Sequence, residues 1–157
     1  MIPPKINILL ADDDQTDCLL FKDALSELPI AANLITVNDG EQLIAELNTT
    51  KNELPDVLFL DLNMPRKNGF ASLGLIKRST KLQHIPVIIF STTSEMDAIK
   101  QVYKEAAHYF ITKPVAFFQL KKVIYEALTL ISKKNNPMPL TENFVITGDS
   151  IAIPELK

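Results

Sequence analysis

The sequence predicts an α/β fold in which five helices cover both faces of a doubly wound, five-stranded parallel sheet. Two observations indicate this fold. Apolar runs of strand length alternate five times along the chain with stretches whose apolar residues recur at helical spacing. The connections between these segments are short, as expected when each helix returns the chain to the start of a parallel strand. The chain has 157 residues and is 46% hydrophobic, so one domain with a substantial core is expected.

The first unit is a strand over residues 5–11 and a helix that ends near Leu28. The strand is apolar without alternation, which is typical of a strand covered on both faces. Three carboxylates, Asp12, Asp13 and Asp14, follow it and open the helix, where they suit the positive end of the helix dipole. The helix face expected to be buried consists of Leu20, Phe21, Ala24, Leu25 and Leu28.

The second and third units repeat this pattern. A short strand over residues 33–37 precedes a helix that Asp39 should cap, with Gln42 as its reciprocal partner. The third strand covers residues 57–60 and carries Asp61 at its end. The expected inner faces are Leu43, Ile44 and Leu47 in the second helix, and Leu73, Leu75 and Ile76 in the third helix, over residues 70–80.

The fourth strand, over residues 86–91, ends in the hydroxyl residues Ser91 and Thr92. Ser94 followed by Asp97 is a capping signature for the next helix. The buried stripe of that helix would be Ile99, Val102 and Ala106.

The fifth strand covers residues 108–112 and turns at Lys113-Pro114. The helix after it has the most regular amphipathic pattern in the chain. Its apolar positions are Phe117, Leu120, Val123, Ile124, Ala127 and Ile131.

The composition argues against several classes of function. A net charge of −3 and a pI near 5.4, with scattered basic residues, give no electrostatic footprint for nucleic acid or an anionic membrane surface. No apolar run approaches the ~18 residues of a membrane span. The single cysteine, Cys18, cannot form an internal disulfide, and the N-terminus lacks the pattern of a signal peptide, so a cytoplasmic protein is expected.

The residues at the strand ends predict a site for phosphoryl chemistry. In open parallel sheets the carboxyl ends of the strands meet at one edge, and ligands bind there. Crowded carboxylates at that edge repel each other, and a hard divalent cation with oxygen ligands relieves the repulsion. The residues that this edge should gather are Asp12, Asp13, Asp61, Ser91, Thr92 and Lys113.

We expect the cation to be Mg²⁺, because it keeps several waters and takes only one or two protein carboxylates. Asp13, Asp61 and the backbone carbonyl of Asn63 would bind it. Asp12 could hold a water molecule bound to the metal.

A carboxylate can also attack phosphorus and form an acyl phosphate. Catalysis would then consist mostly of positioning and charge neutralisation, with the metal on one side and Lys113 on the other. Ser91 or Thr92 could donate a hydrogen bond to the transferred group.

These residues resemble the receiver domain of two-component response regulators, the CheY-like family, over about residues 5–134. That family has an acidic pair after the first strand, a phosphoaccepting Asp after the third, Ser or Thr after the fourth and Lys-Pro after the fifth. The loop from Asn63 to Gly69 also looks like the family's loop after the phosphorylated Asp. The resemblance implies a flavodoxin-like sheet with strand order 2-1-3-4-5. The matching residues are Asp12-Asp13, Asp61, Ser91 and Lys113-Pro114.

The resemblance further implies that Asp61 takes a phosphoryl group from a phosphohistidine on a sensor histidine kinase or a histidine phosphotransfer protein. Ser91 would turn toward the phosphate, and Phe110, at the position of the family's switch aromatic, would rotate inward behind it. Such a protein catalyses its own phosphotransfer and hydrolysis but is not an enzyme for outside substrates. A downstream protein would read the signal on one face, formed by residues 95–106, 108–112 and 117–131.

Two alternatives remain. The segment Asp12-Asp13-Asp14-Gln15-Thr16 also fits the motif of haloacid-dehalogenase-like phosphatases, with Asp12 as nucleophile and Asp14 as acid. Chain order argues against it, because that superfamily needs an acidic strand end after its lysine, and here Asp61 precedes Lys113. The other alternative is a receiver-like scaffold used only for binding, which the intact set of acid, hydroxyl and lysine disfavours.

The receiver domain would occupy residues 1–134, and residues 135–157 form a C-terminal tail. Two apolar segments, 144–146 and 151–153, flank turn-forming residues, so a short hairpin is expected. We expect this tail to pack on the domain or on a neighbouring copy. We also expect a stand-alone regulator whose output is contact with other proteins, with a homodimer as one form of that contact.

Overall fold

The computed structural model describes residues 5–49, 54–133, 138–149 and 151–154. Five parallel strands form one sheet in the order β2-β1-β3-β4-β5, which confirms the predicted topology. The strands are β1 (Ile6–Ala11), β2 (Ala32–Val37), β3 (Val57–Leu60), β4 (Val87–Ser91) and β5 (Tyr109–Thr112). The helices are α1 (Gln15–Ser26), α2 (Gly40–Thr49), α3 (Gly69–Arg78), α4 (Met96–Lys104), α5 (Phe117–Ile131) and the 3₁₀ helix η1 (Thr141–Asn143).

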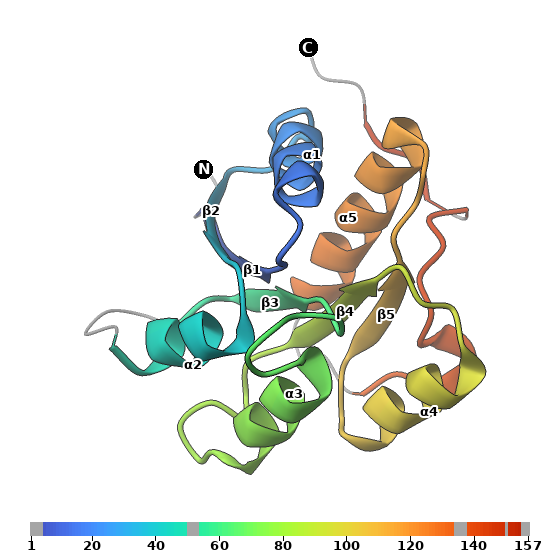
Figure 1. Ribbon diagram of the computed structural model, residues 1–157. Coiled ribbons are helices and arrows are strands. Elements are labelled where there is room, and N and C mark those ends of the chain that lie inside the picture. The colour runs from blue at the N-terminus through green and yellow to red at the C-terminus, as the bar shows by residue number, and fades with distance from the viewer. Residues whose placement is uncertain (1–4, 50–53, 134–137, 150, 155–157) are drawn as a thin grey trace.

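The helices cover both faces of the sheet, as the apolar strands predict (Figure 1). Helices α1 and α5 lie on one face, and α2, α3 and α4 lie on the other. Strand residues alternate between the two layers, so that Leu10 and Phe59 pack toward α1 and α5 while Leu9 and Leu58 pack toward the other helices. Within the described ranges, no helix combines the length and the apolar character needed to cross a bilayer.

Two leucines expected on buried helix faces are exposed instead. Leu20 in α1 is 41% exposed and Leu75 in α3 is 38% exposed, so both predictions were wrong. Neighbouring residues on a helix point about 100° apart. Because Phe21 and Ile76 are fully buried, the residue before each of them turns toward solvent.

Helix α4 begins and ends differently from the prediction. The signature of Ser94 and Asp97 is not used, because Glu95 is the N-cap residue and its side chain makes no capping bond. Ala106 lies beyond the helix end, at a φ of 67° in the left-handed region. Ala107 is fully buried and fills the core position expected for Ala106.

The cap predicted for α2 is confirmed. Asp39 Oδ1 accepts a hydrogen bond from the Gln42 N–H at 2.8 Å. Gln42 Oε1 accepts in return from the N–H of Asn38 at 2.9 Å, one residue earlier than in a capping box. The other carboxylate oxygen of Asp39 accepts from Arg66 Nε at 3.1 Å, which ties the start of α2 to the loop after Asp61.

The C-terminal segment lies along β5 as a short extra edge of the sheet. Val145 forms a parallel bridge with Phe110. The Phe110 N–H donates to the Phe144 carbonyl at 3.0 Å, and the Ile146 N–H donates to the Phe110 carbonyl at 2.9 Å. The expected hairpin is not formed, since residues 144–146 pair with β5 and residues 151–153 are not in a strand. Residues 135–137, 150 and 155–157 of the predicted tail lie outside the described residues.

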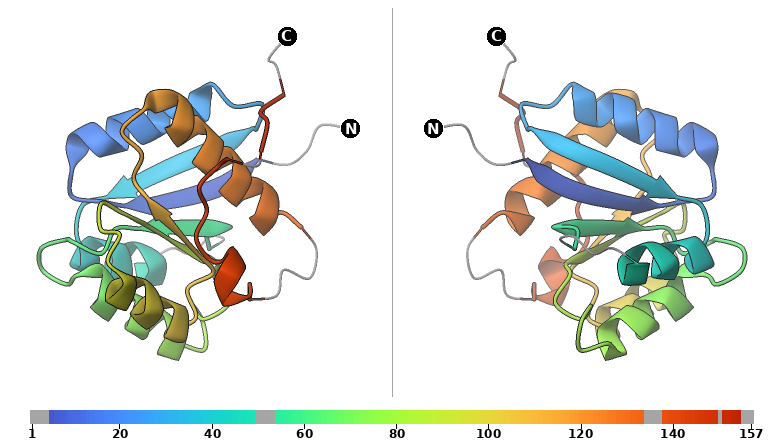
Figure 2. Two further views of the ribbon diagram at one scale, coloured as in Figure 1. Left: turned by 90° about the vertical axis from the view of Figure 1, so that its right-hand side faces the viewer. Right: turned by 90° about the vertical axis from the view of Figure 1, so that its left-hand side faces the viewer.

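The segment runs beside α4 and α5 (Figure 2), and side chains of both helices contact it. The Tyr103 hydroxyl donates to the Pro139 carbonyl at 2.9 Å, and the Gly148 N–H donates to Glu126 Oε1 at 3.1 Å. Phe144 is 1% exposed, and its ring meets the Tyr103 ring edge-on with centroids 5.0 Å apart. The segment from residue 138 to residue 149 therefore contributes to the core of the domain.

Replacing the buried Phe144 should destabilise the whole domain. We expect Phe144→Ala to lower the free energy of unfolding by about 3–4 kcal/mol, because it deletes a fully buried aromatic ring. Val145→Ala, at a position that is 40% exposed, is the matched control and should cost less than about 1 kcal/mol. Urea denaturation measures both values. Equal, small losses in the two variants would show that the segment is not part of the cooperative unit.

A histidine beside β5 should make stability depend on pH. Burial, followed by the positive charge of Lys77, lowers the pKa of His108 from 6.5 to about 4. The unfolded chain therefore binds this proton near pH 6.5 and the folded chain only near pH 4. The free energy of unfolding should fall through this window as the pH drops, by on the order of 2–3 kcal/mol from this group.

The test compares unfolding free energies between pH 7.5 and 4.5 in the parent and in His108→Gln, which should lose less stability on acidification. His84→Gln removes an exposed imidazole and is the control for the substitution itself. A parent and a His108→Gln variant with the same pH dependence would contradict the prediction.

Candidate functional site

Backbone hydrogen bonds bring the predicted site residues to one edge of the sheet. The Asp12 N–H donates to the Val37 carbonyl at 3.0 Å, and the Asp61 N–H donates to the Ala11 carbonyl at 2.9 Å. The Lys113 N–H donates to the Ser91 carbonyl at 2.7 Å. These bonds continue the strand ladders by one residue. Each side chain therefore starts from a fixed backbone position at the carboxyl ends of the strands.

Three carboxylates meet at this edge. Oxygens of Asp12, Asp13 and Asp61 all lie within 4.8 Å of one another. Asp12 is fully buried and Asp61 is 5% exposed, whereas Asp13 is exposed and lies at the mouth of the site. The sequence-based prediction that these acids gather is thus matched by their geometry.

One lysine balances these charges. Lys113 Nζ lies 2.7 Å from Asp12 Oδ2 and 3.5 Å from Asp61 Oδ2. It also lies 5.5 Å from the centroid of the Phe90 ring, within the range of a cation–π contact. The lysine side chain is only 9% exposed, so the ammonium group is largely withdrawn from water.

The same Lys113 ammonium has a further partner that the sequence analysis missed. Asp17 Oδ2, from the first turn of α1, lies 2.8 Å from Lys113 Nζ. Asp14 is the N-cap of this helix and accepts from the Asp17 N–H at 3.0 Å. A carboxylate three residues after an N-cap lies in the first turn of the helix, close to the end of the preceding strand. This spacing was the sequence signal that could have placed Asp17 near the site.

The protonation of the site follows from burial and from this pairing. Burial raises the pKa of Asp12 to about 6, although the Lys113 ammonium acts in the opposite direction. Burial by itself would lower the pKa of Lys113, but the carboxylates of Asp12 and Asp17 outweigh it and raise the pKa above the ordinary value. Lys113 is therefore charged at neutral pH, and the Asp12 carboxylate gains from any additional cation beside it.

The two buried acids are oriented by their own loops. The Asp14 N–H donates to Asp12 Oδ1 at 3.0 Å, and the Asn63 N–H donates to Asp61 Oδ1 at 3.2 Å. Both are bonds from the backbone two residues further on, as in an Asx turn. In each acid, the Oδ2 atom makes no such bond and faces Lys113.

The loop after Asp61 is packed tightly against the strand end. The Gly69 N–H donates to the Leu62 carbonyl at 3.0 Å. A Cβ atom at Gly69 would lie 2.2 Å from the Asp61 carbonyl oxygen, a distance that no real side chain tolerates. Glycine at this position therefore allows the start of α3 to lie directly against the backbone of the candidate phosphoacceptor.

The hydroxyl residues and the candidate switch lie near the site but make different contacts. Ser91 is fully buried at the end of β4, and its Oγ accepts from the Thr93 N–H at 3.3 Å. Thr92 is exposed. Within the described part of the chain, neither hydroxyl is hydrogen-bonded to the carboxylates. Phe110 is fully buried inside β5, with its ring centroid 6.4 Å from that of Phe144.

The residues present fit a divalent cation. Asp12, Asp13 and Asp61 supply a set of hard oxygen donors, and Asp13 is exposed to solvent. Asp12 Oδ2 is buried and, among the described residues, has no hydrogen bond of good geometry despite its ion-pair contact with Lys113. That oxygen retains a lone pair for a further cation or for a water bound to it.

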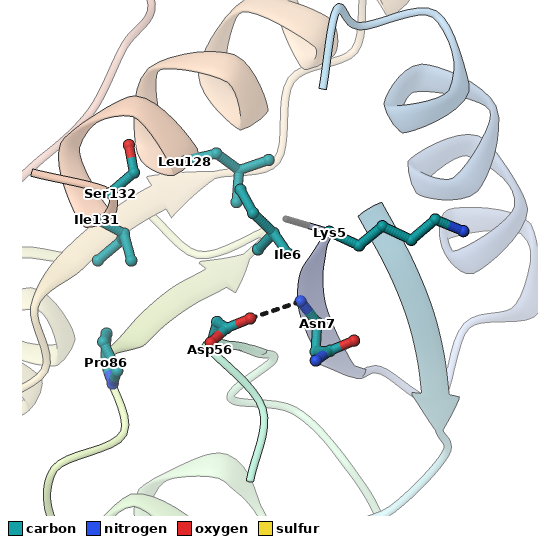
Figure 3. Close-up of a pocket in the computed structure, with 8 residues that line it drawn as sticks. All are labelled: Lys5, Ile6, Asn7, Asp56, Pro86, Leu128, Ile131 and Ser132. Atoms are coloured by element: carbon teal, nitrogen blue, oxygen red, sulfur yellow. Dashed lines mark hydrogen bonds between the residues drawn. The ribbon is translucent and has the colours of Figure 1, made fainter. Parts of the chain in front are cut away.

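A hollow of about 410 Å³ lies at the opposite end of the sheet (Figure 3). Its walls include the apolar side chains of Ile6, Leu128 and Ile131. Its only carboxylate among the described lining residues, Asp56, accepts a hydrogen bond from the Asn7 N–H at 2.7 Å. This hollow has no cluster of acids and so offers no comparable chemistry.

The sequence and the structure are similar to known signalling proteins. The response regulator Rcp1 of Synechocystis sp. is 31% identical over 126 residues, which cover 78% of this chain and 85% of Rcp1. The crystal structure of the phosphorylated cyanobacterial phytochrome response regulator RcpA aligns with a TM-score of 0.74 and 29% identity, covering 87% of this chain and 100% of RcpA. The Mn²⁺-bound form of Rcp1 aligns with a TM-score of 0.72 and 28% identity, covering 87% and 100% of the two chains.

A family model supports the same assignment independently. The model of the response regulator receiver domain matches residues 8–125. This range contains β2 to β5, all of β1 except its first two residues, and every strand-end residue of the site. Acceptance of a phosphoryl group is the standard function of this family. The chain therefore belongs to the receiver-domain family of two-component response regulators.

Proposed function

We propose that Asp61 is the phosphoacceptor of this receiver domain. The observation that carries the proposal is the position of the Asp61 carboxylate, next to two other acids and 3.5 Å from the Lys113 ammonium. A carboxylate oxygen of Asp61 would attack the phosphorus of a phosphohistidine. The phosphorus–nitrogen bond breaks, its electron pair stays on the imidazole nitrogen, which takes up a proton, and an acyl phosphate forms.

The neighbouring side chains would stabilise the transferred group. The Lys113 ammonium lies 3.5 Å from Asp61 Oδ2, so its positive charge would be beside a phosphoryl group on that carboxylate. Ser91, or the exposed Thr92 beside it, would donate a hydrogen bond to another phosphoryl oxygen. The donor set of Asp12, Asp13 and Asp61 fits a divalent cation.

We propose that this cation is Mg²⁺. Asp13 and Asp61 would bind it together with the Asn63 backbone carbonyl, and Asp12 would hold one of its waters. When bound, it supplies positive charge that offsets the negative charge of the phosphoryl oxygens.

The phosphoryl donor would be a sensor histidine kinase or a histidine phosphotransfer protein, because the reaction needs a phosphohistidine. The similarity to RcpA, described as a phytochrome response regulator, makes a phytochrome-type kinase a candidate. The protein would catalyse its own phosphorylation and hydrolysis without turning over other substrates. Its output would be contact with another protein or with a second copy of itself.

Phe110 would connect the site to the C-terminal segment. Among the described residues, the two backbone hydrogen bonds between this segment and β5 are both made by Phe110, and the ring of Phe110 lies against Phe144. A rotation of Phe110 toward Ser91 would remove one side of the Phe144 pocket. We propose that phosphorylation is read on the face of α4, β5 and α5 through a change in how this segment packs.

Phosphorylation itself is tested by intact-mass measurement after incubation with acetyl phosphate and Mg²⁺. We expect one phosphate on the parent protein and none on Asp61→Asn, because the amide nitrogen and oxygen are poor nucleophiles. Removal of Mg²⁺ with a chelator should reduce labelling at least about tenfold. Asp23→Asn, on the exposed face of α1, is the control for a lost carboxylate. Labelling that survives in Asp61→Asn would refute the assignment.

A fluorescent reporter tests the link between the site and the C-terminal segment. The chain contains no tryptophan, so Val145→Trp introduces a single reporter at a position that is 40% exposed. We expect beryllofluoride, a mimic of the phosphoryl group, to shift its emission in the presence of Mg²⁺. The same reporter combined with Asp61→Asn should not respond. An unchanged spectrum in a protein that binds beryllofluoride would contradict the proposed coupling.

A further inference from the structure

Asp17 is a carboxylate that the proposed phosphotransfer does not use, although it contacts the central lysine. Its Oδ2 lies 2.8 Å from Lys113 Nζ, whereas Asp61 Oδ2 lies 3.5 Å from the same nitrogen. Asp12 Oδ2 is the other close partner, 2.7 Å from Lys113 Nζ. The ammonium group in this state is therefore held more closely by Asp12 and Asp17 than by Asp61.

Asp17 differs from Asp12 in the exposure of its side chain to solvent. Its side chain is 29% exposed, whereas the Asp12 side chain is fully buried. Asp17 is also outside the group of three acids that could hold a cation. Its backbone, in contrast, is fixed, because its N–H donates to the cap residue Asp14. Asp17 thus presents a partly exposed carboxylate from a fixed backbone position at the start of α1.

These contacts put Asp17 in competition with a phosphoryl group on Asp61. Lys113 is the only ammonium group near the three clustered acids among the described ion pairs. A phosphoryl oxygen on Asp61 needs the Lys113 ammonium as a partner. To reach that oxygen, the ammonium has to weaken its 2.8 Å contact with Asp17.

We propose that Asp17 is a positioning residue that holds Lys113 toward α1 and thereby restrains the phosphorylation of Asp61. The inference rests on the proposed function of Asp61 and deepens it. Asp17 does not touch the reacting atoms. It acts by setting how readily the Lys113 ammonium moves from α1 to the phosphoryl group.

The test measures the second-order rate constant for phosphorylation by acetyl phosphate in saturating Mg²⁺. We expect Asp17→Asn to raise it by roughly fivefold, because the amide keeps the size of the side chain but not its charge. Asp23→Asn removes a carboxylate from the exposed side of the same helix and should leave the rate within about twofold of the parent. Asp17→Glu restores the charge and should return the rate toward that of the parent.

A double-mutant cycle separates an effect through Lys113 from a general effect of charge. In a Lys113→Gln background, which phosphorylates more slowly, Asp17→Asn should change the rate by less than about twofold. A fivefold increase in that background would show that Asp17 acts on the donor directly and would overturn the inference. An unchanged rate of Asp17→Asn in the protein with Lys113 would overturn it as well.

A readout that needs no phosphorylation distinguishes this inference from the proposed function. The ¹⁵N resonance of the Lys113 ammonium should shift in Asp17→Asn and stay in place in Asp23→Asn. If the resonance shifts but the parent is not labelled on Asp61, the contact is real and the proposed function is wrong, and with it the regulatory role of Asp17. If the parent is labelled but the resonance does not shift, only the inference about Asp17 is wrong.

Discussion

A single ammonium group holds the acidic edge of this protein together. Lys113 contacts carboxylates from Asp12, Asp17 and Asp61, and the first and last of these are buried. Like charges this close repel strongly where water is scarce, so the lysine offsets the repulsion between the carboxylates that the ends of β1 and β3 bring together. The lysine directly follows β5, and the sheet order places β4 between β5 and β3. Its side chain passes the ring of Phe90 on that strand.

Short local contacts then give this charge cluster its geometry. One oxygen of Asp12 and one oxygen of Asp61 each accept from the backbone two residues further along, which leaves the second oxygen of each acid free to face the ammonium. The absence of a side chain at Gly69 keeps the next helix against the Asp61 backbone. A phosphoacceptor needs this kind of preorganisation, because its reaction gains mainly from positioning and charge.

Much of this arrangement could be predicted from the sequence, and the limits have physical causes. Parallel strands buried on both faces are continuous apolar runs, and chain order places their ends at one edge, so the acids at 12, 13 and 61 and the lysine at 113 could be gathered without coordinates. The contact between Asp17 and Lys113 could not be predicted: the position after the N-cap places Asp17 near the start of α1, but the direction in which α1 leaves β1 decides which residue its carboxylate reaches. The cap of α4 was misassigned because Ser94 and Asp97 have the right spacing, but the helix begins after Glu95. The pairing of residues 144–146 with β5 is a contact distant in sequence, and periodicity carries no information about such a contact.

Strand β5 joins the site to the surface that would report on it. Lys113 follows the strand directly, and Phe110 lies within it, three residues earlier. Without the C-terminal segment, β5 would be an open edge with unpaired backbone groups, which is a site for unwanted pairing. The segment covers this edge through the backbone of Phe110, the residue whose ring lies against Phe144. A packing change at Phe110 would therefore reach the segment, because the ring of this residue lies against Phe144 and its backbone makes the two described backbone hydrogen bonds between β5 and the segment. Because Lys113 directly follows β5, any strengthening of its contact with Asp61 acts on this short strand. Strand β4, which pairs with β5 on its other side, carries Ser91.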